Sequence, residues 1–156
     1  MDINIKIPGS MSYEELFGFA YSLTNSLEVI TELFRRAVFN IIFINNDTHA
    51  KNFTFMMNSK GVWSIAPAYD LIYSKGPGVM HPSSTIKGKK KDYKREDFLY
   101  LGRMYNLKEK EMNEIIDSTI NKTLAIKDKG LDLGILPKNL DPIIMDTKDM
   151  VLSIGK

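Results

Sequence analysis

Apolar residues recur at intervals of three and four along much of this chain, which is the pattern of helices that bury one face. The clearest stretch predicts a helix that begins near Leu27 and ends near Ile44. Its buried face would consist of Leu27, Ile30, Leu33, Phe34, Ala37, Val38 and Ile41. A shorter helix is predicted over residues 13–23, because Ser12 and Glu15 have the spacing of a capping box.

The last third of the chain shows the same periodicity and predicts three more helices. They cover about 95–105, 108–128 and 141–153. Gly130 is placed to cap the end of the second of these helices, and Pro142 is placed in the first turn of the third. Most of the chain is therefore predicted to be helical.

Other stretches favour β structure. Residues 1–8 alternate apolar and polar side chains, which predicts a short strand. Residues 53–57 and 62–65 are rich in β-forming types, and Asn58-Ser59-Lys60-Gly61 between them has the composition of a tight turn. A long loop is predicted over 73–94. The predicted fold class is mainly α with a small β hairpin.

The composition places the chain among globular proteins. It has 156 residues, 44% hydrophobic and 26% charged, which fits a single domain over 1–156. The absence of cysteine excludes thiol catalysis and thiolate metal sites. No apolar run reaches the roughly 20 residues of a membrane span, and the N-terminus lacks the features of a signal peptide. We therefore expect a cytoplasmic protein without a membrane partner.

The charge is nearly balanced, but one segment is strongly basic. The net charge of +2 is too small to predict direct nucleic-acid binding. Residues 87–95 nevertheless contain six basic side chains: Lys87, Lys89, Lys90, Lys91, Lys94 and Arg95. Such a segment is either a solvated loop or a surface for phosphate or an acidic partner. The sequence leaves both interpretations open.

The segment from Asn45 to Asp70 carries the residues that could do chemistry. Asp47, His49, Lys51 and Asn52 lie within six positions, just after the long apolar helix, and Asp70 follows the predicted hairpin. An antiparallel hairpin brings its two ends together, so we expect Asn52 and Asp70 to meet. Their oxygens suit Mg²⁺.

Phosphoryl transfer uses such a set in two roles, because some groups hold metal while a separate carboxylate accepts the proton of the attacking hydroxyl. In protein kinases the catalytic Asp precedes the metal-binding Asn by five positions, as Asp47 precedes Asn52 here, and a later Asp also binds metal. The candidate metal ligands are therefore Asn52 and Asp70, and Asp47 is the candidate base. His49 or Lys51 could supply positive charge near the phosphates.

Two alternatives remain open from these residues alone. Asp and Asn are common in turns, so Asp47 and Asp70 could simply cap helices and His49 could be structural. A metal-dependent hydrolase could also use Asp47, His49, Asn52 and Asp70. The chain has only one further histidine, His81, so such a site would suit Mg²⁺ better than Zn²⁺.

The segment resembles a known family. Residues 40–52, with the pattern Asn-x-Asp-x-His-x-Lys-Asn, resemble the catalytic loop of HipA-like kinases, and residues 63–71 resemble the metal-binding segment of that family, with Tyr-Asp-Leu in place of Asp-Phe-Gly. Residues 12–16, 84–89 and 95–99 are also similar, so the resemblance covers about Ser10 to Ala125.

This resemblance implies a bacterial serine/threonine kinase of toxin–antitoxin systems that uses ATP and Mg²⁺. By motif position, Asp47 would be the catalytic base, Asn52 and Asp70 the Mg²⁺ ligands, and His49 and Lys51 groups near the phosphates. The resemblance also implies a mainly helical C-terminal lobe, a protein substrate from the translation machinery, such as an aminoacyl-tRNA synthetase, and a DNA-binding antitoxin as partner.

The chain departs from the family by lacking the pattern of an N-terminal lobe. It has no glycine-rich strand–loop and no strand like Val-Ala-Ile-Lys. We therefore expect a C-terminal lobe alone, with little or no kinase activity by itself, because phosphate positioning supplies much of the rate. A separate subunit could supply the missing lobe. The alternative is a non-catalytic module that binds a partner through the exposed face.

Overall fold

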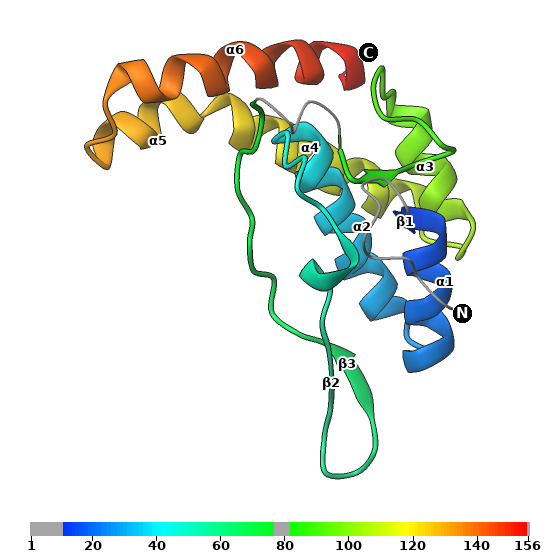
Figure 1. Ribbon diagram of the computed structural model, residues 1–156. Coiled ribbons are helices and arrows are strands. Elements are labelled where there is room, and N and C mark those ends of the chain that lie inside the picture. The colour runs from blue at the N-terminus through cyan, green and yellow to red at the C-terminus, as the bar shows by residue number, and fades with distance from the viewer. Residues whose placement is uncertain (1–10, 77–81, 156) are drawn as a thin grey trace.

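The computed structural model describes residues 11–76 and 82–155, and these residues form a mainly helical fold with a small β hairpin, as predicted (Figure 1). The strand predicted over 1–8 lies outside the described residues. The helices are α1 Tyr13–Thr24, α2 Leu27–Ile42, α3 Arg95–Arg103, α4 Glu109–Leu124, α5 Ile126–Asp132 and α6 Pro137–Ile154. The strands are β1 Met11–Ser12, β2 Phe55–Met57, β3 Trp63–Ile65 and β4 Ser84–Thr85, and one 3₁₀ turn, η1, covers Ala50–Asn52.

Helix α2 lies at the centre of the fold and packs against α1, α3, α4 and α6. Its predicted apolar face is buried except at Leu27, which is 50% exposed at the first position of the helix, and Ile30, Leu33 and Phe34 are completely inaccessible to solvent. Burial of each such side chain contributes roughly 1.5–3 kcal/mol. The end of α2, where the candidate catalytic segment begins, is therefore held by the hydrophobic core.

Helix α1 begins at the predicted capping box. The backbone N–H of Ser12 donates to Glu15 Oε2 at 2.8 Å, and the N–H of Glu15 donates to Ser12 Oγ at 3.1 Å. Immediately before the helix, β1 pairs in parallel with β4, so that Met11 faces Ser84. This pairing is absent from the sequence prediction, because a strand of two residues is too short to show alternation.

The C-terminal helices differ from the prediction in three respects. The helix predicted over 108–128 is interrupted at Ala125, and α5 begins at the next residue. Gly130 lies inside α5 instead of capping a helix. A glycine is needed at this position because α6 passes so close that a Cβ atom would lie 2.6 Å from Leu140 Cδ2. Helix α6 begins at Pro137, so Pro142 lies in the helix interior.

The hairpin matches its prediction and projects away from the helical body (Figure 1). Strands β2 and β3 pair with Phe55 opposite Ile65. In the turn, Asn58 Oδ1 accepts hydrogen bonds from two backbone N–H groups, and Gly61 has a φ of 78°. After β3 the chain runs back along the molecule toward α6 (Figure 1). Among the described residues, no helix is long and apolar enough to span a bilayer.

Candidate active site

Asn52 and Asp70 meet at the base of the hairpin, as the sequence predicts. The side-chain Nδ2 of Asn52 lies 3.3 Å from Asp70 Oδ2 and also donates to the backbone carbonyl of Asp47 at 2.8 Å. Asn52 is buried in η1, whereas the side chain of Asp70 is exposed. Because both donor contacts use the amide nitrogen, the Asn52 amide lies against the Asp70 carboxylate through its nitrogen, and its oxygen is left without a hydrogen bond within the described residues.

Asp47 lies on the same loop, and its backbone is fixed while its side chain is open. Its N–H donates to Ser74 Oγ at 3.1 Å, and its carbonyl accepts the Asn52 bond. The side chain is 49% exposed. A carboxylate held in this way by its own backbone can approach a substrate hydroxyl without rearrangement of the loop.

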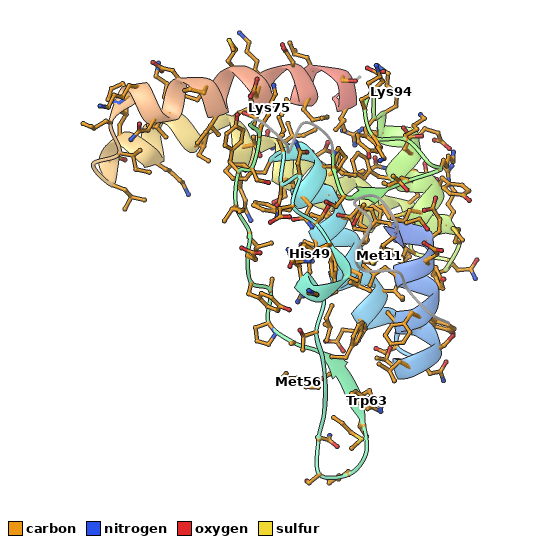
Figure 2. The ribbon with its side chains drawn as sticks, in the orientation of Figure 1. Met11, His49, Met56, Trp63, Lys75 and Lys94 are labelled. Carbon is orange, nitrogen blue, oxygen red and sulfur yellow. The ribbon has the colours of Figure 1, made fainter. Side chains whose placement is uncertain are left out.

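His49 and Lys51 lie on this loop without strong side-chain partners. His49 Nε2 is 3.9 Å from Asp47 Oδ1, too far for a hydrogen bond, and its buried Nδ1 has no partner among the described residues. Figure 2 shows His49 beside η1. The Lys51 side chain is exposed, and its carbonyl accepts a hydrogen bond from the hydroxyl of Tyr69. The other histidine, His81, lies outside the described residues.

Asp70 has a left-handed backbone, with a φ of 56°. Few residues other than glycine adopt this conformation, although Asp and Asn tolerate it best. The Asp70 carbonyl accepts a hydrogen bond from Asn45 Nδ2 at 3.0 Å. The backbone at the candidate metal ligand is therefore held by a residue of the loop that follows α2.

Asn45 belongs to a buried polar chain that reaches α1. Its Nδ2 also donates to Asn40 Oδ1 at 3.1 Å, and Asn40 donates to the hydroxyl of Tyr13 at 3.2 Å. Burial raises the pKa of Tyr13 to about 12, against the opposing effect of its hydrogen bond with Asn40. Tyr13 is therefore neutral at physiological pH, and the chain connects α1, α2 and Asp70 without a buried charge.

A second set of contacts holds the loop from β4. The N–H and hydroxyl of Ser83 both donate to the Asn46 carbonyl, at 3.0 and 3.1 Å, and Ser84 Oγ donates to the Thr48 carbonyl at 2.5 Å. Sequence reasoning missed Asn45, Ser74, Ser83 and Ser84. Asn45 could be singled out only as a turn residue after a helix, and the serines carry no local signal.

Most of the basic segment 87–95 is bound to its own fold. Lys89 pairs with the buried Asp97 at 2.8 Å, and Arg95 donates to Asn113 and Asp117 at 2.8 and 2.6 Å. Lys87 lies 4.1 Å from the centre of the Tyr100 ring. The described contacts therefore leave only part of this segment as a free cationic surface.

The donor set suits Mg²⁺ bound together with a phosphate ligand. Mg²⁺ usually takes one or two protein oxygens and completes its shell with substrate phosphates and water. Asp70 and Asn52 provide that number of ligands. Within 11–76 and 82–155 no group of three His, Cys, Asp or Glu side chains is placed to hold a metal. This arrangement favours phosphoryl transfer over a hydrolase that binds its metal through protein ligands alone.

Comparisons with known proteins identify the family and the fold. A family model described as the HipA-like C-terminal domain matches residues 4–126. A Haemophilus influenzae protein named "Putative kinase" is 35% identical over 63 residues, which are 40% of this chain and 18% of that protein. This chain matches the structure of one chain of the Shewanella oneidensis MR-1 toxin–antitoxin complex of HipA, HipB and operator DNA with a TM-score of 0.70.

The match to the Shewanella structure covers 92% of this chain and 34% of that chain at 18% identity, so it shows a shared fold. This chain thus corresponds to about a third of the structural relative, and its match to the Haemophilus protein covers less than a fifth of that protein.

Proposed function

Because the chain belongs to the family of HipA-like C-terminal domains, we propose that it carries the catalytic base and the metal ligands of a kinase that phosphorylates serine or threonine in proteins. The observation that carries this proposal is the contact of Asn52 with both Asp70 and the Asp47 backbone. It brings the proposed base, on the loop after α2, close to the proposed ligands Asn52 and Asp70 at the two ends of the hairpin. Kinases depend on such positioning more than on covalent chemistry.

In this proposal Asp70 and the amide oxygen of Asn52 hold Mg²⁺ of Mg²⁺–ATP. The ion, when bound, neutralises charge on the phosphates. Asp47 orients the attacking hydroxyl and accepts its proton as the oxygen bonds to the γ-phosphorus and ADP leaves. Lys51 and His49 lie on the same loop and are free to contact phosphate oxygens.

The substrate and partners are proposals of the same kind. The Shewanella relative is in a complex with HipB and operator DNA, and we propose a DNA-binding antitoxin as a partner of this protein too. A protein of the translation machinery would be the phosphoacceptor, in the cytoplasm. A nucleotide-covering lobe, in the same polypeptide or a second subunit, would complete the cleft, so little turnover is expected from these 156 residues alone.

A partner-binding role without catalysis is the second candidate, and one observation favours it. The hairpin carries large apolar side chains in solvent: Met56 is 47% exposed, Met57 57% and Val62 58%. Figure 2 shows Met56 and Trp63 on this projecting hairpin. Exposed apolar side chains gathered on one element are typical of an interaction surface. Nucleotide binding distinguishes the two candidates, because a purely structural module does not need it.

The decisive experiment is calorimetric titration of the chain with Mg²⁺–ATP. Asp70→Asn keeps the side-chain shape and tolerates the left-handed backbone, but removes the charge. We expect it to weaken binding at least about tenfold. Asp92→Asn is the matched control, because Asp92 is also exposed and has the same φ of 56°. Equal affinity of the wild type and Asp70→Asn, or no binding by the wild type, would contradict the proposal.

A further inference from the structure

Helix α6 contacts the segment that follows Asp70 through one carboxylate. The Tyr73 hydroxyl donates to Asp146 Oδ2 at 2.5 Å, and Lys75 Nζ donates to Asp146 Oδ1 at 2.7 Å. Figure 2 shows Lys75 next to α6. Its partner Asp146 is 71 positions further along the chain. We call this set, Asp146 with Tyr73 and Lys75, the α6 anchor. Each carboxylate oxygen of Asp146 therefore accepts a hydrogen bond from one of these two side chains.

The residue between the two anchored side chains is Ser74, which touches the catalytic loop through three bonds. Its N–H donates to the Ile44 carbonyl at 3.0 Å. Its hydroxyl donates to Asn45 Oδ1 at 3.3 Å and accepts the Asp47 N–H at 3.1 Å. Ser74 therefore contacts both Asp47 and Asn45, the residue that holds the Asp70 carbonyl.

We propose that Asp146 is a positioning residue for the candidate active site, which it stabilises by fixing Tyr73 and Lys75 on either side of Ser74. The inference rests on the proposed kinase function for its catalytic meaning, but its structural part stands alone. The family match ends at residue 126, and α6 lies beyond it. No motif of the catalytic segment therefore points to this residue.

The surroundings of Asp146 agree with a fixed contact. Its side chain is 14% exposed. Burial alone would raise the pKa of Asp146, but the hydrogen bonds from Lys75 and Tyr73 and the charge of Lys75 outweigh it and lower the pKa. Burial and Asp146 together raise the pKa of Tyr73 to about 12. At neutral pH the anchor therefore contains a carboxylate and a protonated phenol.

A neighbouring aspartate provides the control. Asp149 lies three positions after Asp146 on α6 and is exposed. Both aspartates line a cavity of about 410 Å³. It makes no hydrogen bond or ion pair within the described residues. Asp149→Asn therefore makes the same change of charge on the same helix without breaking the α6 anchor.

The first arm of the test is amide hydrogen exchange, measured by NMR on the whole chain. In Asp146→Asn we expect the N–H groups of Asp47 and Ser74 to exchange at least about tenfold faster than in the wild type. Core amides of α2 serve as the internal measure of global unfolding. Asp146→Glu, which keeps the charge, should restore part of the protection, and Asp149→Asn should not change it.

The second arm is the affinity for Mg²⁺–ATP. It should fall several-fold in Asp146→Asn and stay unchanged in Asp149→Asn. Unchanged exchange in Asp146→Asn, or equal acceleration in both variants, would overturn the positioning role. Faster exchange with unchanged affinity would overturn its link to the site. If the wild type binds no Mg²⁺–ATP, the proposed function fails, and the exchange arm alone still decides whether Asp146 positions the loop.

Discussion

Asn45 is buried just beyond the end of α2 and uses both ends of its side-chain amide. The nitrogen donates to Asn40 and to the Asp70 carbonyl, and the oxygen accepts from Ser74. Two segments, α2 and the stretch after β3 that carries Asp70 and Ser74, are thereby joined at one side chain. No shorter or apolar side chain can make these three bonds.

We predict that Asn45→Ala destabilises the protein by about 1–3 kcal/mol, because the buried groups of Asn40 and Asp70 lose a partner. It should also weaken Mg²⁺–ATP binding, since the Asp70 backbone is no longer held. Urea denaturation and calorimetry measure the two effects. Asn121→Ala is the control, because Asn121 is exposed on α4 and its side chain makes no described hydrogen bond. A stability equal to that of this control would contradict the role given to Asn45.

Helices α5 and α6 pack so closely that the residue at 130 has no room for a side chain. A Cβ atom there would lie 2.6 and 2.9 Å from the two methyl carbons of Leu140, and Leu140 itself is buried. Glycine in a helix is normally a cost, but here it permits the approach of the two helices. The pair in turn supports the part of α6 that carries the anchor.

Gly130→Ala should therefore destabilise the protein. Overpacking costs about 1–3 kcal/mol, which exceeds the gain of up to about 1 kcal/mol that alanine brings to a helix. Thermal or urea unfolding measures the difference. Gly76→Ala is the comparison, because a Cβ atom at Gly76 would meet nothing within 4 Å. An increase in stability for Gly130→Ala would show that α6 can move away at no cost.

The elements that sequence reasoning predicted well are those with local signals. The Ser12–Glu15 pair starts α1, and the turn ending at Gly61 defines the hairpin. The sequence predicts Gly130 at the end of a helix and Pro142 in the first turn of one, but both lie inside helices. Each residue type is compatible with either position, and the contact between α5 and α6 selects the position that the local sequence does not favour. The break at Ala125 has no glycine or proline to mark it.

In the candidate site, too, the residues with a local sequence signal were predicted and those placed by distant contacts were not. Asp47, Asn52 and Asp70 follow from their spacing, because the hairpin alone brings the last two together. Ser74 and Asp146 do not, because their roles depend on contacts between segments far apart in the chain. A serine in a loop and an aspartate on a helix are ordinary in isolation. Their proposed roles depend on contacts with Asn45 and Asp47 for Ser74 and with Tyr73 and Lys75 for Asp146.

Across the whole molecule, the α6 anchor makes stability depend on pH in a definite direction. The pKa of Asp146 in the folded protein lies below its ordinary value of 3.8. A carboxyl with a lowered folded pKa stabilises the protein above the ordinary pKa, and this contribution is lost as the pH falls through the folded value. Acidification should therefore remove what the anchor contributes at neutral pH.

We predict that the wild type is more stable than Asp146→Asn at pH 7 and that the difference shrinks as the pH falls from about 5 toward 2. Urea denaturation at a series of pH values gives this difference directly. Asp149→Asn should instead follow the wild type over the whole range. A gap between the wild type and Asp146→Asn that is constant or grows in acid would contradict the direction of the Asp146 shift.

The order in which a ribosome makes this chain gives the α6 anchor a further consequence. Asp146 is synthesised 71 positions after Lys75, when the whole catalytic segment has already been made. Domains fold as units during synthesis, and early segments emerge first. Under the proposed positioning role, the loop bearing Asp47 reaches its final geometry only after α6 has emerged. A chain whose translation stops before α6 then carries every candidate catalytic side chain but lacks the α6 anchor.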